Sequence, residues 1–221
     1  MVYRGKQRSV PEIFIELRED DPEFKKAMTA HSFRAGQIVA EPQALGSNLY
    51  TLMKGRVQLI REGPNGRRLA LATLGPGAMF GEGALLSAED PSVKAVSLTD
   101  CVVWTAPAPQ AHELALRYPV LSWGLLQTVG QRLAQVENRM EDVAYKRLPE
   151  RLAGLLLELA NDGRAIRGTS HQSLADMLGT YRETISAILR GFKDDGLVEL
   201  GYRRIELRDP TGLRLAAGSI D

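Results

Sequence analysis

The sequence has only one cysteine, Cys101, and three histidines among its 221 residues. A single cysteine excludes an internal disulfide, a zinc site built on several thiolates and a four-cysteine iron–sulfur cluster within one chain. His31, His112 and His171 are widely separated along the chain, so they do not predict a shared metal site. We therefore expect no metal, and the scarcity of cysteine favours a reducing, cytoplasmic compartment.

The chain also lacks an excess of charge and a long apolar run. Its 28 Lys and Arg residues against 27 Asp and Glu residues give a net charge of +1, so attraction to nucleic acid has to come from local clusters. The basic residues of segment 1–9 are not followed by an apolar run, so we expect a loose arm rather than a signal peptide. Neither a membrane-spanning helix nor a membrane partner is predicted.

The groups that catalysis needs are also missing. No nucleophile with an attending base, glycine-rich phosphate loop or carboxylate pair is found, so the sequence does not predict an enzyme. Cys101 begins the apolar run Cys101–Trp104. A haem ligand and an oxidation sensor are possible roles for this thiol, but a small core residue is the usual one.

A pair of short helices hinged at Gly179 is predicted over residues 169–190. Apolar residues recur at helical spacing on both sides of this glycine, which can adopt the positive φ that a sharp turn requires. This is the pattern of a helix-turn-helix. Thr180 is expected to cap the second helix, with long polar side chains following at the end that enters a major groove. The alternative is a helical hairpin in which Thr180 and Glu183 form a capping box.

Short alternating or β-branched runs, separated by glycine and proline, fill residues 33–105. This rhythm is typical of an all-β sandwich or barrel. Turn sequences at 62–66 and at Lys54-Gly55 predict connections between neighbouring strands. Residues 10–28 are expected to form one or two short helices before the strands, with Pro11 in a first turn.

A long helix is predicted over residues 118–145, where apolar residues recur every three or four positions. A seam this long exceeds what a small β domain can cover, which favours a parallel homodimer over packing on the same chain. The predicted dimer interface consists of Leu121, Leu125, Val129, Leu133, Val136, Met140 and Val143.

A hinge is expected at residues 146–149, because Pro149 disfavours helix in the residue before it, and a further helix at 150–160. Beyond the helix-turn-helix, alternating runs at 197–200 and 204–207 predict a hairpin, the wing of a winged helix. The predicted fold class is α+β, with a β domain at 1–117, a dimerisation helix and hinge at 118–146, and a winged helix-turn-helix at 147–221.

The segment from Arg182 to Leu189 closely resembles the recognition-helix pattern of the cyclic AMP receptor protein and fumarate-nitrate regulator (Crp/Fnr) family. Residues 52–57, the turn at 74–77 and Phe80-Gly81-Glu82 resemble landmarks of that family's cyclic-nucleotide-binding-type jelly roll. The resemblance implies a cytoplasmic, dimeric transcription regulator that binds an inverted repeat in double-stranded DNA, with RNA polymerase as a partner if it is an activator. A ligand-sensing or catalytic barrel with an incidental helical tail is the competing class.

In the family, the residues matching Arg182 and Glu183 contact base edges. The chemistry agrees, because a guanidinium donates two parallel bonds to guanine and a carboxylate accepts one from the cytosine amino group. A second family arginine is replaced by Ala187, so one base contact of the usual half-site is expected to be lost. The predicted DNA-binding residues are Ser170, Gln172, Tyr181, Arg182, Glu183, Thr184, Ser186, Arg190 and Arg203.

The same resemblance implies an effector pocket at Gly81, Glu82, Ser92 and Lys94. In the family, the glutamate holds a ribose and an arginine–serine pair holds the cyclic phosphate. Here Pro91 stands in the arginine's position, and Lys94 is the nearby cation that could replace it. On the long helix, Val136 and Glu137 replace the family's adenine-binding threonine and serine. We therefore expect no cofactor, and we expect that cyclic AMP is not the effector. The alternative is a regulator that depends on another small ligand bound in the β domain.

Overall fold

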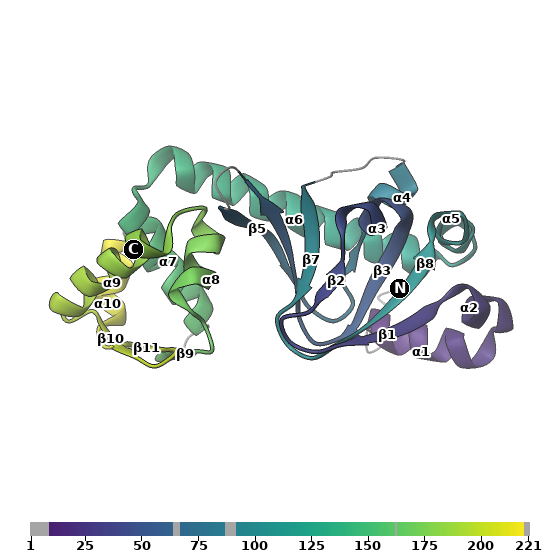
Figure 1. Ribbon diagram of the computed structural model, residues 1–221, viewed down its shortest axis with the longest axis horizontal. Helices are drawn as coiled ribbons and strands as arrows, with labels where there is room; N and C mark the ends of the chain where they lie inside the picture. The colour runs from purple at the N-terminus through teal and green to yellow at the C-terminus, as the bar shows by residue number, and fades with distance from the viewer. Residues whose placement is uncertain (1–8, 64–66, 87–91, 162, 219–221) are drawn as a thin grey trace, which may run out of the picture. The chain divides into compact units, whose positions relative to one another are not determined.

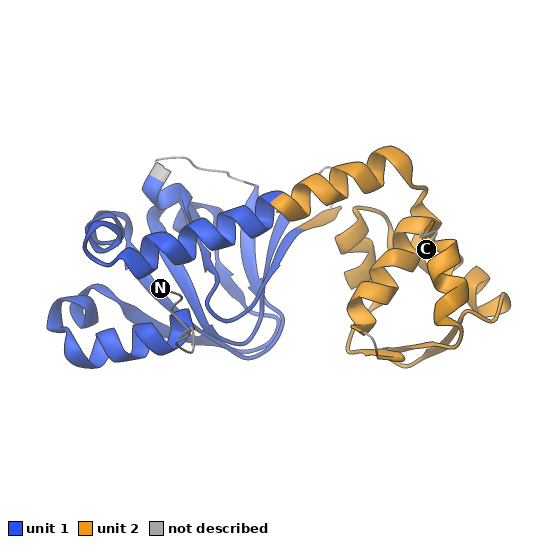
Figure 2. Ribbon diagram, turned by 180° about the vertical axis from the view of Figure 1, so that it is seen from behind, with its two compact units in different colours: residues 1–62, 71–133 blue, residues 63–70, 134–221 orange. Residues whose placement is uncertain are grey.

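The structure is a computed structural model that describes residues 9–63, 67–86, 92–161 and 163–218 (Figure 1). The chain divides into two compact units, residues 1–62 with 71–133 and residues 63–70 with 134–221 (Figure 2). Three sequence expectations lie outside the described residues: the arm up to residue 8, the turn centre at 64–66, and the role of Pro91.

The first unit is built on two four-stranded sheets, with strand orders β1-β8-β3-β6 and β2-β7-β4-β5. Their strands are β1 (Thr29–Phe33), β2 (Ile38–Ala40), β3 (Asn48–Lys54), β4 (Val57–Glu62), β5 (Arg68–Leu74), β6 (Met79–Phe80), β7 (Val93–Ser97) and β8 (Cys101–Pro107). Side chains alternate across β3, because Tyr50 and Leu52 enter the core between the sheets while Leu49 packs on the other face. The predicted β jelly roll is confirmed, and it begins at Thr29, before the expected start at residue 33.

Helices cover the outer face of the sheet that contains β3 and β8 (Figure 1). The helices that lie in the first unit or begin there are α1 (Val10–Asp20), α2 (Pro22–Ala27), α3 (Pro42–Ser47), α4 (Gly83–Leu86), α5 (Ala108–Arg117) and α6 (Pro119–Tyr145). Helix α6 continues into the second unit from residue 134. Phe14 of α1, Phe24 of α2 and Leu121 of α6 are fully or almost fully buried in one cluster with Trp104. The two predicted N-terminal helices are confirmed, with Pro11 in the first turn of α1.

Two turns of the β domain require glycine. Gly55 has a φ of +89°, and a Cβ there would lie 2.4 Å from the carbonyl oxygen of Asp100. Gly81 has a φ of +82°, and its Cβ would lie 2.2 Å from the carbonyl oxygen of Asn48. A side chain at either position would clash with backbone as well as strain φ. The turn at Gly81 therefore sets the backbone position of the next residue, Glu82.

The second unit contains the predicted winged helix. Its elements are α7 (Leu148–Ala160), β9 (Ala165–Arg167), α8 (His171–Leu178), α9 (Arg182–Asp194), β10 (Val198–Gly201), β11 (Arg204–Leu207) and α10 (Pro210–Ala216). The three strands form one sheet in the order β10-β11-β9. Val198 pairs with Leu207 and Gly201 with Arg204, so the predicted hairpin is confirmed. Strand β9 and helix α10 were not predicted.

The expected hinge before α7 is shorter than predicted. Helix α7 begins at Leu148, so Pro149 lies in its first turn rather than in a hinge. Proline is well tolerated there, because the N–H groups of a first turn have no partner within the helix. The backbone N–H of Arg147 donates to the Glu150 carboxylate at 2.9 Å and closes this helix end. Only Lys146 and Arg147 separate α6 from α7.

None of the helices in the described ranges combines the length and the apolar character that crossing a membrane requires.

Candidate nucleic-acid interface

Helices α8 and α9 meet at Gly179, whose φ of +65° confirms the predicted left-handed turn. The hydroxyl of Ser170 caps α8 by accepting from the backbone N–H of Ser173 at 3.0 Å. The expected cap of α9 by Thr180 is wrong. The helix begins at Arg182, so Tyr181 holds the N-cap position, and its side chain makes no capping hydrogen bond.

Helix α9 has one buried and one exposed face. Ile185, Leu189 and Phe192 recur at helical spacing and pack into the core of the winged helix. The exposed face carries Arg182, Glu183, Ala187 and Arg190. Among the described residues, the side chains of Arg182 and Glu183 have no hydrogen-bond or ion-pair partner. Their polar atoms are therefore available to a ligand outside the protein.

Gln172 and Arg203, which are also predicted to bind DNA, make hydrogen bonds inside the domain. The side-chain amide of Gln172 donates to the Asp176 carboxylate at 2.7 Å, one turn further along α8. Arg203 lies in the turn of the β10–β11 hairpin with a φ of +48°, and its guanidinium donates to the Gly168 carbonyl at 3.1 Å. Because a guanidinium has five N–H donors, Arg203 keeps donors for a further ligand.

His171 joins the two helices, although sequence analysis gave it no role. Its Nδ1 lies 2.8 Å from the Ser186 hydroxyl, which itself donates to the Arg182 carbonyl at 2.9 Å. Since a hydroxyl has one hydrogen, His171 is the donor in the first bond. Burial, followed by the nearby charge of Arg182, lowers the pKa of His171 and favours its neutral form. No sequence pattern links residues fifteen positions apart on different helices.

The predicted effector residues with charged side chains both have partners. The Glu82 carboxylate accepts from the guanidinium of Arg132 on α6 at 2.6 Å. The Lys94 ammonium forms an ion pair with Glu62 on the neighbouring strand β4. The carbonyl of Ser92 accepts from the backbone N–H of Glu62 at 3.2 Å. Lys94 and Ser92 therefore lie together at Glu62, while Glu82 is held by the long helix.

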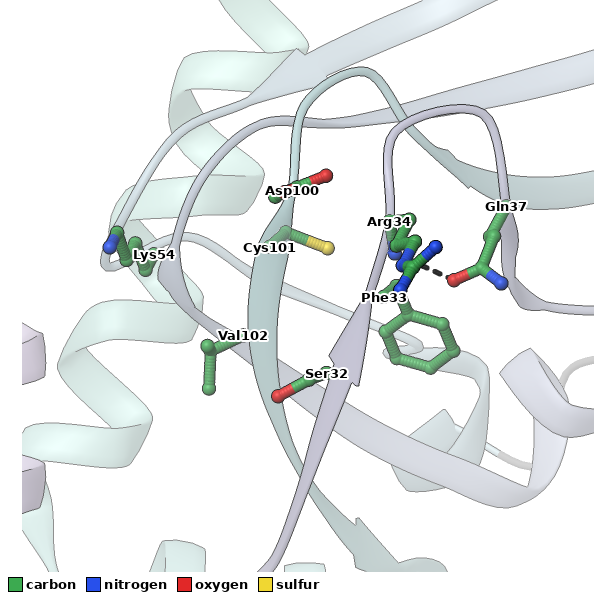
Figure 3. Close-up of a pocket in the computed structure, with 8 residues that line it drawn as sticks. All are labelled: Ser32, Phe33, Arg34, Gln37, Lys54, Asp100, Cys101 and Val102. Atoms are coloured by element: carbon green, nitrogen blue, oxygen red, sulfur yellow. Dashed lines mark hydrogen bonds between the residues drawn. The ribbon is translucent and has the colours of Figure 1, made fainter.

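A pocket of about 500 Å³ lies elsewhere in the β domain, at the ends of β1, β3 and β8 (Figure 3). Its lining residues are Ser32, Phe33, Arg34, Gln37, Lys54, Asp100, Cys101 and Val102. Burial, with a smaller effect of the Asp100 charge, raises the pKa of the Cys101 thiol. Cys101 also belongs to the core between the sheets, which supports its role as a core residue. In the described part of the chain, no three His, Cys, Asp or Glu side chains are grouped as metal ligands.

The apolar residues of α6 fall on two faces of the helix. Leu121 is 1% exposed, and it packs with Leu125 against the core of its own β domain. A second set is 41–67% exposed and follows an alternating three- and four-residue spacing. It consists of Leu126, Val129, Leu133, Val136, Met140 and Val143, and is called the α6 stripe below. Leu121 and Leu125, which were predicted to lie in the dimer interface, pack against their own β domain instead. Leu126, which was not predicted, belongs to the exposed set.

A β sandwich, a long helix and a winged helix-turn-helix together define a regulator with a β domain and a DNA-binding domain. The profile of the cyclic nucleotide-binding domain matches residues 30–118, and that of the Crp-like helix-turn-helix domain matches residues 150–216. The chain belongs to the Crp/Fnr family of DNA-binding transcription regulators.

Relatives are similar over most of their length. The chain is 32% identical to the transcriptional regulator SdrP of Thermus thermophilus over 85% of this chain and 94% of SdrP. It is 31% identical to the cyclic AMP receptor protein of the same organism over 75% of this chain and 77% of that protein. The crystal structure of a CRP/FNR family transcriptional regulator from Thermus thermophilus superposes with a TM-score of 0.71 at 30% identity, covering 86% of this chain and 99% of that one.

Proposed function

We propose that this protein is a cytoplasmic homodimeric transcription regulator that reads an inverted repeat and needs no cyclic AMP to do so. The domain boundaries proposed for it are a β domain to residue 117, a dimerisation helix and hinge at 118–146, and a DNA-binding domain from residue 147. If it activates transcription, RNA polymerase is its further partner. No enzymatic role is proposed, because SdrP and the superposed crystal structure are both named as transcriptional regulators.

The observation that carries the proposal is the exposed face of α9. Arg182 and Glu183 stand side by side at the start of the recognition helix, and their side-chain polar atoms have no partner within the described residues. Long polar groups in this position are the ones that reach base edges when such a helix enters a major groove. Arg182 is suited to guanine and Glu183 to cytosine, so each half-site is expected to contain two adjacent G·C pairs.

The α6 stripe supports the dimer. Six large apolar side chains exposed on one helical face are unfavourable in water, and a second copy of the same face would bury all of them. Burial contributes about 25 cal/mol per Å² of apolar surface. A two-fold dimer carries two recognition helices, so its site is expected to be an inverted repeat. Helix-turn-helix dimers bind half-sites one helical turn apart, about 34 Å centre to centre, and we expect the same spacing here.

The paired charges of the β domain support independence from cyclic AMP. A cyclic phosphate needs a cation, but Lys94 forms an ion pair with Glu62. A ribose needs a carboxylate, but Glu82 is bonded to Arg132. A nucleotide bound at these groups would have to compete with both existing pairs.

Selection of bound duplexes from a random DNA pool tests the proposal. The purified protein, without added nucleotide, is expected to enrich an inverted repeat of G·C-containing half-sites. Arg182→Ala is expected to lose the preference at one base pair of each half-site, while Arg190→Ala serves as a matched loss of charge on the same helix face. Failure of the wild-type protein to enrich any symmetric sequence would overturn the proposal.

An effector-dependent regulator is the second candidate. It is favoured by the match of residues 30–118 to the cyclic nucleotide-binding domain profile, together with the name of the relative called cyclic AMP receptor protein. Under this alternative, the same selection would give enrichment only when a small ligand is added. Parallel arms with cyclic AMP, cyclic GMP and no addition separate the two candidates.

A further inference from the structure

Arg132 connects the long helix to the β domain. Its guanidinium lies 2.6 Å from the Glu82 carboxylate, and the side chains are 25% and 29% exposed. The neighbouring Gly81 packs so closely against the backbone at Asn48 that a Cβ at its position would clash. The pair therefore joins one face of α6 to a closely packed turn, while a quarter of the Arg132 side chain remains exposed.

The α6 stripe defines a heptad register for the helix. Its spacing places Leu126, Leu133 and Met140 at a positions and the three valines at d positions. The flanking g positions are then Leu125, Arg132 and Arg139, and the flanking e positions are Gly130, Glu137 and Ala144. These are the positions through which two supercoiled helices contact each other beside their apolar seam.

In a parallel pair, each g residue faces the e residue five positions later in the partner helix. Of the three pairs in this register, Leu125 with Gly130 and Arg139 with Ala144 carry no opposite charges. Arg132 faces the partner's Glu137, which gives a cation and an anion. Glu137 is exposed, and within the described residues it has no ion-pair partner that this contact would break. An antiparallel pair would instead bring g positions together, with Arg132 and Arg139 among them, so the charges favour the parallel arrangement.

We infer that Arg132 of each protomer lies between two carboxylates, Glu82 of its own chain and Glu137 of the partner subunit. This inference rests on the dimer in the proposed function. Arg132 has enough N–H donors for both carboxylates, since a guanidinium carries five. The bridge connects the Gly81-Glu82 turn of one β domain to the partner's long helix. The contact between the β domain and the partner subunit is therefore made by side chains of the protein, without a ligand.

Substitutions that remove or reverse a charge test the bridge. The dimer dissociation constant of each variant is measured by sedimentation equilibrium. Glu137→Gln removes two bridging contacts per dimer and is expected to weaken association on the order of ten-fold. Glu141→Gln, an exposed carboxylate on the same helix away from the register positions above, is the matched control and is expected to sediment as wild type. Raised salt is expected to reduce the difference between wild type and Glu137→Gln.

Glu137→Arg is expected to weaken the dimer further, because it sets two guanidiniums opposite each other. Adding Arg132→Glu gives the guanidinium introduced at position 137 two carboxylates to pair with, at positions 82 and 132. The dissociation constant of the double variant is therefore expected to return to within a few-fold of the wild-type value. A double variant no better than Glu137→Arg alone, or a Glu137→Gln variant that associates as wild type, would overturn the inference and leave the proposed dimer standing. A wild-type protein that is monomeric at all concentrations, with or without DNA, would overturn both.

Discussion

The α6 stripe gives the most quantitative prediction. In Val129→Asp combined with Val136→Asp, two stripe positions per protomer become carboxylates, so four valines are lost from each dimer interface. These valines are 41% and 46% exposed in the single chain, so dimerisation has roughly half of each side chain left to bury. Full burial of such a side chain is worth about 1.5–3 kcal/mol, which gives about 0.7–1.5 kcal/mol per valine here.

Four such contributions amount to about 3–6 kcal/mol, which corresponds to a dissociation constant larger by roughly two to four orders of magnitude. The four carboxylates add to the loss, because they would have to leave water and would face one another across the seam. The double variant is therefore expected to be monomeric at micromolar concentration in sedimentation velocity. DNA affinity should fall with it, because each recognition helix would then bind alone.

A matched control uses the same chemistry elsewhere on the helix. Gln131→Asp combined with Asn138→Asp adds the same charge at exposed positions of α6 outside the stripe and is expected to remain dimeric. Thermal denaturation checks that both double variants keep the wild-type fold. If the Val129→Asp, Val136→Asp variant is folded and still sediments as a dimer, the assignment of the interface to α6 is refuted.

Further predictions concern the DNA-binding domain. Arg182→Ala should cost about 1–3 kcal/mol per half-site and relax the preference at one base, whereas Arg190→Ala should weaken all sequences alike and flatten the salt dependence of anisotropy titrations. Ala187→Arg should add a guanine preference at one further position in DNA selection, and an unchanged consensus would argue against the placement of α9 in the groove. Leu189→Ala should lower the free energy of unfolding by about 2–5 kcal/mol in urea titrations, because this leucine is fully buried. The pKa of His171 lies below its ordinary value near 6.5, so its contribution to stability is present above that pH and is lost as pH falls through the lowered pKa. His171→Asn should therefore flatten the drop in melting temperature between pH 7.5 and 5, and equal pH dependence of the two proteins would contradict this role.

The architecture was predictable from sequence because its signals are local. Glycine at the turns, alternation in the strands and helical spacing at 169–190 are each written within a few neighbouring residues. Local rules also explain the errors at element ends. Thr180 is a good capping residue, yet the helix starts one position later than such a cap requires, and Pro149 is a helix breaker except in a first turn.

What sequence could not supply depends on contacts between distant residues. From the spacing of apolar residues alone, Leu121 and Val129 were both assigned to the dimer interface. Only the structure shows that Leu121 is buried against the β domain whereas Val129 is exposed. Arg132 and Glu82 are fifty positions apart, and no pattern in either segment predicts their ion pair. Strand β9 has three residues, too few for a period of two to be recognised.

In the proposed function, two copies of this protein read one symmetric site without a nucleotide. Anisotropy titrations in nucleotide-free buffer test it with three duplexes: a selected inverted repeat, the same repeat with one half-site scrambled, and the repeat lengthened by about 5 bp, half a helical turn. We predict one dimer per intact duplex and a large loss of affinity on both altered duplexes, because each removes one recognition helix from its groove. Equal affinity for all three duplexes, or binding to the intact repeat only after cyclic AMP is added, would contradict the claim.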